Sequence, residues 1–237
     1  MPEDLMILIA AAASIAFFHT VFGPDHYLPF IMMAGSGKWS IRKTAVVTFF
    51  CGLGHVISSV ILGFLGIMLG VAVSQLEAVE SVRGDIAVWA LIAFGLVYFV
   101  WGIRRALRNK PHTHIHSHID GDEHVHTHTH MEHHSHVHKP GSKKKMTPWV
   151  LFVIFVLGPC EPLIPLLMYP AAKNSIPAVI LVSGIFGAVT ITTMLGIVLI
   201  SCFGFHYVPS ARLERYTHAI AGATISLCGL SILMFGL

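Results

Sequence analysis

Charged residues are scarce in this sequence: they make up 11% of the 237 positions, against 54% hydrophobic residues. Soluble domains carry about a quarter charged residues, so this balance excludes an ordinary water-soluble globule. The few charges are also crowded together, because 12 of the 27 Asp, Glu, Lys and Arg residues lie between Arg104 and Lys145. The composition therefore predicts an all-α integral membrane protein.

Several familiar patterns are missing as well. No C-x-x-C spacing occurs among the four cysteines, which excludes a secreted disulfide framework. No basic patch is interleaved with stacking aromatics, so we expect no nucleic-acid partner. The acidic start at Glu3 and Asp4 does not fit a cleaved signal peptide, and we expect the first apolar stretch to remain as a membrane helix. Nothing resembles a soluble-enzyme active site, so we predict neither an enzyme nor a tightly bound cofactor.

Six apolar stretches are long enough to cross a bilayer, which takes roughly 20 helical residues. They cover residues 5–33, 44–73, 86–103, 148–171, 176–204 and 216–236. Prolines interrupt the first and the fourth of these stretches, at positions Pro24, Pro29, Pro159, Pro162 and Pro165. Because proline removes a backbone donor and crowds the preceding turn, we predict that these two helices are broken.

Lysine and arginine are concentrated in the first, third and fifth loops. Positive loops stay on the cytoplasmic side, so this bias predicts that both termini lie outside. The predicted location is the cytoplasmic membrane of a bacterium or archaeon, with the third loop facing the cytoplasm.

The two proline-containing stretches resemble each other. Val21, Gly23, Pro24 and Leu28 recur as Val156, Gly158, Pro159 and Leu163 at a constant offset of 135. Three spans separate the copies, so the second copy would be inverted in the membrane. We therefore predict a 3+3 inverted repeat, with units at 1–107 and 147–237 around a loop at 108–146. Secondary transporters use this plan and bind their substrates at broken helices near the midplane.

Side chains that can bind metal occur inside these spans. Asp25 and Glu161 hold neighbouring places in the two repeat copies, and a carboxylate at membrane depth is costly without a partner or a wet cavity. His19 and His26 are seven residues apart, and His55 shares a helical face with Cys51 and Ser59. We expect the predicted metal ligands to be His19, Asp25, His26, His55 and Glu161, with Cys160 as a further candidate. A carboxylate pair that only bridges the two halves is the alternative.

Nitrogen and carboxylate ligands suit divalent nickel, cobalt, zinc and copper. They argue against sodium or potassium sites and against all-oxygen magnesium sites. The pattern thus indicates a transition-metal ion, bound as the transported substrate.

The third loop holds 12 histidines, mostly in H-x-H alternation. Such tracts are typical of metal binding, so we predict a cytoplasmic metal-capture segment. A polycation that responds to pH is the alternative, because many histidines protonate together. The predicted capture residues are His112, His114, His116, His118, His124, His126, His128, His130, His133, His134, His136 and His138.

The motif from His19 to His26, H-T-V-F-G-P-D-H, resembles the H-P-x-x-G-x-D-H signature of hydrogenase- and urease-accessory nickel permeases, with Thr20 in place of proline. It is also similar to the H-x4-D-H motif of nickel/cobalt permeases, here one residue longer. The six spans and the His-rich loop resemble the nickel/cobalt exporter group and its urease-accessory-like relatives. The resemblance implies that His19, Asp25 and His26 bind nickel or cobalt, with zinc less favoured.

The same broad superfamily includes thiol-redox carriers and exporters of sulfite or organic sulfur anions, and both remain alternatives. The redox carriers use one cysteine after a proline in each repeat. Here Cys160 follows Pro159, but its counterpart is Asp25. Our main hypothesis is a nickel or cobalt transporter. Its expected partners are metal ions, the lipid bilayer and a cytoplasmic metallochaperone, with the oligomeric state left open.

Overall fold

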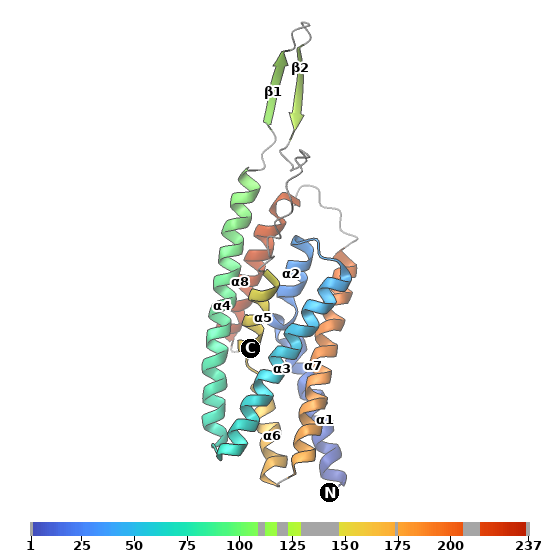
Figure 1. The fold of residues 1–237 in the computed structure, drawn as a ribbon, viewed down its shortest axis with the longest axis vertical. Coiled ribbons are helices and arrows are strands. Elements are labelled where there is room, and N and C mark those ends of the chain that lie inside the picture. The colour runs from blue at the N-terminus through green and yellow to red at the C-terminus, as the bar shows by residue number, and fades with distance from the viewer. Residues whose placement is uncertain are drawn as a thin grey trace, which may run out of the picture.

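The fold was analysed in a computed structural model, which describes residues 2–108, 112–117, 123–128, 147–173, 175–205 and 214–235. Apart from one hairpin, the described residues form helices and short connections (Figure 1). The helices are α1 (Pro2–Phe22), η1 (Pro24–His26), α2 (Leu28–Ser36), α3 (Ile41–Leu69), α4 (Val73–Arg108), α5 (Thr147–Leu157), α6 (Leu163–Ala172), α7 (Ile176–Phe205), η2 (Glu214–Tyr216) and α8 (Thr217–Phe235). The strands are β1 (His112–Ser117) and β2 (Glu123–His128).

Within the part of the chain that the structure describes, five helices are long and apolar enough to cross a membrane: α1, α3, α4, α7 and α8. Helices α5 and α6 are apolar but shorter, and together they cover the fourth predicted span, at residues 148–171. The chain is thus a multi-pass membrane protein, as its composition indicates. Figure 1 shows the N-terminus, the α3–α4 turn and the α6–α7 connection at one end, with the α2–α3 connection at the other.

The first predicted span is broken where the sequence predicts it. Helix α1 ends at Phe22, and Gly23 N still donates to His19 O at 3.0 Å. Pro24 then begins the short helix η1, and Tyr27 N donates to Pro24 O at 3.3 Å before α2 begins. This turn separates the two helical segments α1 and α2, and His26 in η1 is buried between them and the neighbouring helices.

The second predicted break is confirmed at Gly158–Pro162, between α5 and α6. Helix α5 ends with Gly158 N donating to Ile154 O at 3.0 Å. Pro159 cannot donate a backbone hydrogen bond, and the chain turns until Leu163 N donates to Cys160 O at 2.9 Å. The carbonyl and amide groups of this break are thereby free to meet side chains from other helices.

Helix α4 differs from its predicted bounds of 86–103. It begins at Val73 and ends at Arg108, so its 36 residues include a stretch that the sequence analysis placed in a loop because of its charges. Two of those charges, Glu80 and Arg83, pair with each other three residues apart, which suits a helix. The preceding helix α3 ends at Gly70, whose φ of +65° is the left-handed conformation that glycine adopts readily.

Small residues allow α4 and α8 to pack closely along each other. A Cβ atom placed on Gly95 would lie 2.5 Å from Ser226 N and 2.8 Å from Gly222 O. A Cβ on Gly222 would in turn collide with the backbone nitrogen of Phe99. Membrane helices associate through such small-residue contacts, because lipid offers no hydrophobic drive to bring them together.

Buried apolar side chains form two separate clusters. One is formed mainly by α2, α5, α7 and α8, with Cys51 from α3, and includes Phe30 and Phe155. The other lies around α6 and α7 and includes Cys160, Leu167 and Phe186. The two helix breaks place polar side chains beside these clusters, and those side chains form the candidate site.

The His-rich segment contains a hairpin that the all-α prediction did not include. Strands β1 and β2 pair antiparallel, with His112 opposite His128, His114 opposite His126 and His116 opposite His124. Between the histidines the strands carry Thr113, Ile115, Val125 and Thr127, and β-branched residues favour extended backbone. The H-x-H alternation has the two-residue period of a strand, which explains the pairing.

Candidate metal centre

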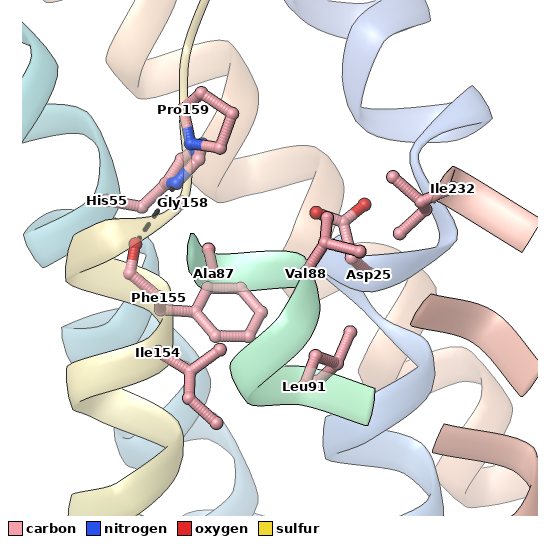
Figure 2. Close-up of a pocket in the computed structure, with 10 residues that line it drawn as sticks. All are labelled: Asp25, His55, Ala87, Val88, Leu91, Ile154, Phe155, Gly158, Pro159 and Ile232. Carbon is pink, nitrogen blue, oxygen red and sulfur yellow. Dashed lines mark hydrogen bonds between the residues drawn. The ribbon is translucent and has the colours of Figure 1, made fainter. Parts of the chain in front are cut away.

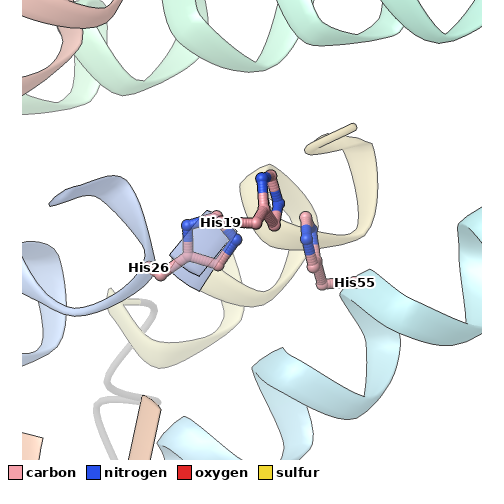
Figure 3. Close-up of side chains that lie close together, drawn as sticks. All are labelled: His19, His26 and His55. Carbon is pink, nitrogen blue, oxygen red and sulfur yellow. The ribbon is translucent and has the colours of Figure 1, made fainter. Parts of the chain in front are cut away.

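Three histidines from separate elements meet inside the bundle. His19 comes from the last turn of α1, His26 from η1 and His55 from the middle of α3. One ring nitrogen of each lies within 4.8 Å of those of the other two (Figure 3). The ring centroids are 4.8 Å apart for His19 and His26 and 5.1 Å apart for His26 and His55. The break after Phe22 thus gathers the histidines that the sequence analysis singled out.

Two of these rings carry a buried nitrogen that lacks a partner. The Nε2 atoms of His19 and His26 have no hydrogen-bond partner among the residues that the structure describes. Leaving a buried polar atom unsatisfied costs about 1–3 kcal/mol. A bound cation between the rings would satisfy both nitrogens.

Asp25 fixes the orientation of His26. The Nδ1 atom of His26 lies 3.1 Å from Asp25 Oδ1 and 3.1 Å from Gly23 O. Both of these oxygens accept hydrogen bonds, so Nδ1 carries a proton, and in the neutral form of His26 the lone pair is on Nε2. Metal-binding histidines commonly donate their second ring nitrogen to a carboxylate in this way. Asp25 therefore acts on His26 as an orienting partner in this conformation.

His55 is held by the second helix break. Its Nδ1 lies 3.3 Å from the carbonyl oxygen of Phe155, to which it donates. Its Nε2 lies 3.1 Å from Sγ of Cys160, whose side chain is fully buried. With Nδ1 protonated, Nε2 accepts from the thiol. Cys160 thus contacts one of the three histidines, and its role as a metal ligand remains a prediction.

A small cavity adjoins the centre, which we call the histidine cavity. Its volume is about 30 Å³, enough for one or two water molecules or a cation. In Figure 2 the Asp25 carboxylate and the Gly158–Pro159 backbone lie around it, with His55 donating to Phe155 behind. Its wall consists of Asp25, His55, Ala87, Val88, Leu91, Ile154, Phe155, Gly158, Pro159 and Ile232.

Glu161 does not join the three histidines in this conformation. It is exposed and lines a wider cavity of about 420 Å³, which we call the acidic cavity. The acidic cavity is formed by Ser74, Glu77, Ala78, Ser81 and Glu161. The physical reason is the turn that follows α5: Cys160 faces the bundle interior, and the next side chain faces outward.

Glu80 and Arg83 are site residues that the sequence analysis missed. Glu80 is fully buried, and its Oε1 lies 3.0 Å from Arg83 Nη1. Cys160 N donates to Glu80 Oε2 at 3.2 Å, and Arg83 Nη2 donates to Gly158 O at 2.8 Å. The available signal was the spacing of three residues between the two charges, with the apolar Leu76 and Ala87 on either side. This pattern fits one continuous helix.

The ligand set fits a divalent transition metal. Imidazole nitrogens bind such ions at about 2.0–2.1 Å, so two nitrogens on one tetrahedral ion are roughly 3.3 Å apart. The present separations of up to 4.8 Å would have to shrink by roughly 1.5 Å, which small changes of side-chain torsion can supply. Three neutral imidazoles with a nearby thiol also match the nitrogen and sulfur preference of these ions.

The predicted capture segment is only partly covered. His118, His130, His133, His134, His136 and His138 lie outside the described residues. The other six capture histidines are in β1 and β2, where the pairing of the backbone is described. Metal capture by this segment remains a prediction.

Apolar helices around a buried polar centre define this chain as a permease-like multi-pass membrane protein. Residues 28–234 match the family described as the cytochrome c biogenesis protein transmembrane region, and the chain belongs to that family. Comparison with curated proteins and with solved structures gave no match. The match does not show a nickel/cobalt permease family, so the likeness to those permeases remains a resemblance of the first-helix motif, which precedes the matched residues. The match agrees better with the thiol-redox alternative than with the metal hypothesis.

Proposed function

We propose that this protein carries a divalent transition-metal ion, nickel or cobalt before zinc, across a membrane. The observation that carries the proposal is the convergence of His19, His26 and His55 within the apolar bundle. Water is scarce at this depth, so buried imidazoles that lack partners need another way to satisfy their nitrogens. A transported cation would provide it, with the Asp25 carboxylate beside the centre.

The two helix breaks supply the parts that transport needs. Broken membrane helices leave backbone groups unpaired and commonly form substrate sites near the midplane. Here η1 carries His26, and the segment after α5 carries Cys160, which contacts His55. In the proposed cycle, the two halves of an inverted repeat move against each other and expose the centre to each side in turn. The His-rich segment would collect metal on the cytoplasmic side.

Cellular metal content tests this proposal. Total nickel, cobalt and zinc would be measured by elemental mass spectrometry in cells that express the intact chain or a His19→Ala, His26→Ala variant at equal abundance. We expect the content of one metal to change only with the intact chain, and the sign of that change gives the direction of transport. A matched control is His218→Ala, because His218 lies on α8 and contacts Tyr98 instead of the centre. Equal metal contents in all three strains would refute metal transport.

A thiol–disulfide electron carrier is the second candidate, and family membership favours it. Haem is attached to c-type cytochromes through cysteine thiols, so their biogenesis depends on thiol reduction. Cys160 follows Pro159 at the second break, as a cysteine does in the redox carriers, and its sulfur contacts the Nε2 atom of His55.

A relay inside one chain needs two thiols that can approach each other. All four cysteines lie in the described residues and all are free. Cys51 belongs to one buried apolar cluster and Cys160 to the other. Cys51 lies one helical turn before His55, the residue that Cys160 contacts, so a disulfide carrier would have to bring these two thiols together. The anion-exporter alternative gains no support from the centre, because Asp25 would repel an anion in the histidine cavity.

A further inference from the structure

The acidic cavity and the histidine cavity lie along one face of α4. The helix contributes Ser74, Glu77 and Ser81 to the acidic cavity and Val88 and Leu91 to the histidine cavity. Successive residues in this set are three, four, seven and three positions apart, which places them along one side of the helix. An ion that follows this face would pass from carboxylates and hydroxyls to the histidines.

The Gly158–Cys160 segment separates the two cavities. Gly84 stands between the two sets of lining residues on α4, and a Cβ there would lie 2.8 Å from Cγ of Pro159. Pro159 therefore rests directly on the helix backbone. Gly158 and Pro159 also form part of the wall of the histidine cavity.

Charged side chains of α4 hold this segment in place. Arg83 donates to Gly158 O at 2.8 Å, and Glu80 accepts from Cys160 N at 3.2 Å. The two side chains pair at 3.0 Å, and Arg83 also donates to Ser59 on α3 at 2.5 Å. Two backbone groups that the break leaves free are thus satisfied by one buried ion pair.

The same segment also limits access to His55. Cys160 Sγ lies 3.1 Å from His55 Nε2, so the thiol occupies the nitrogen that a metal would need. Moving the segment off α4 would free His55 and join the two cavities. We propose that Glu80 and Arg83 are positioning residues, and that they hold Gly158–Cys160 as a gate between the acidic cavity and the metal centre. This inference rests on the proposed transport function.

The accessibility of the Cys160 thiol tests the gate directly. In a chain with Cys51, Cys202 and Cys228 replaced by serine, Cys160 is the only thiol. The full chain would be placed in lipid nanodiscs, and the rate of its alkylation by a water-soluble maleimide would be measured. We expect Glu80→Gln to raise this rate at least tenfold, because it weakens the ion pair and the bond to Cys160 N. The matched control is Asp85→Asn, which removes an exposed charge from α4 that lines neither cavity.

A second variant reaches the gate without a change of charge. Gly84→Ala places a methyl group against Pro159, and we expect it to raise the Cys160 alkylation rate as Glu80→Gln does. Gly196→Ala is its control, because a Cβ there meets no described atom within 4 Å. If Glu80→Gln does not fold, the double variant Glu80→Gln, Arg83→Gln is measured in its place. It removes both charges and so leaves no unpaired buried charge. Unchanged alkylation in Gly84→Ala and in the folded charge variant would overturn the gate.

The gate and the metal proposal can fail separately. Alkylation is first measured without metal, so its rate reports on the gate alone. Nickel chloride is then added to the unlabelled chain, and a bound ion is expected to slow alkylation of Cys160 at least threefold. Faster alkylation in the variants without any effect of nickel, cobalt or zinc would support the gate and count against the metal proposal.

Discussion

Asp25 and His26 are neighbours in the chain, yet Oδ1 of the first lies 3.1 Å from Nδ1 of the second. In a regular α-helix, successive side chains point about 100° apart and do not face each other. The tight turn of η1 brings the two together, so the break in the first span creates the pair as well as the bend. Loss of the Asp25 carboxylate should therefore alter the orientation of the His26 imidazole while leaving the fold intact.

Asp25→Asn is expected to lower metal affinity about 10- to 100-fold, as is usual when the orienting partner of a histidine ligand is lost. Nickel and cobalt binding to the full chain in nanodiscs would be measured by titration calorimetry. Asp85→Asn is the control, because this residue is exposed on α4. Equal affinity in Asp25→Asn and the intact chain would remove Asp25 from the centre.

His55→Ala is expected to reduce metal affinity at least tenfold, or by about 1.4 kcal/mol in binding free energy. His55 is the ligand that α3 contributes, and its loss leaves two imidazoles from one break. His218→Ala should bind metal like the intact chain. A His55→Ala chain with unchanged affinity would show that the ion sits elsewhere.

Metal binding should weaken as pH falls from 7 to 5. Imidazole must be neutral to coordinate a metal, so protons compete for the same nitrogens. Binding would be followed at both pH values in the intact chain and in a variant without the His-rich segment, which carries 12 of the 17 histidines. A centre in the bundle predicts that one site and its pH dependence persist in the shortened chain. Loss of all binding on removing the segment would contradict that centre.

Cysteine replacement separates the two candidate functions. Cys160→Ser is expected to reduce metal affinity while some transport remains, because the three imidazoles stay in place. Cys51→Ser should leave transport unchanged, since Cys51 is buried in the other apolar cluster. A thiol–disulfide carrier predicts that each change abolishes function and that alkylation of the two thiols depends on the redox state. Those results would favour the second candidate.

Gly222→Ala should destabilise the bundle, because its new methyl group would collide with the backbone of Phe99 on α4. Overpacking of this kind typically costs about 1–3 kcal/mol. The midpoint of thermal unfolding in detergent is expected to fall by several degrees, whereas Gly196→Ala should leave it unchanged. An unaltered midpoint for Gly222→Ala would mean that α4 and α8 are less tightly joined than the structure has them.

The sequence predicted the two breaks and five of the six spans, because hydropathy and proline act locally, whereas the predicted fourth span is formed by two shorter helices. The bounds found for α3, α7 and α8 lie within a few residues of the expected ones. The prediction of α4 was too short, since its charged first part looked like a loop. Burial of Glu80 depends on Arg83 and on a segment 80 residues away, and no local pattern could show that.

The candidate site was predicted only in part, because some of its contacts are local in the sequence and others are not. The motif from His19 to His26 is continuous, and its histidines meet through one turn. His55 reaches them only because α3 packs beside the first break, which the sequence did not specify. The choice between Cys160 and Glu161 depends on how the chain turns after α5. Their adjacent positions in the sequence could not decide which faces inward.

Helix α4 has a mechanical consequence that follows from its length. Its 36 residues span about 54 Å, well beyond a hydrocarbon core of about 30 Å. One end carries the ion pair that holds the second break, and the other ends at Arg108, just before the His-rich segment. Because α4 is one continuous helix, its two ends move together when it tilts. Under the proposed function, a tilt of the Arg108 end on metal binding would also move the part of α4 against which Pro159 packs.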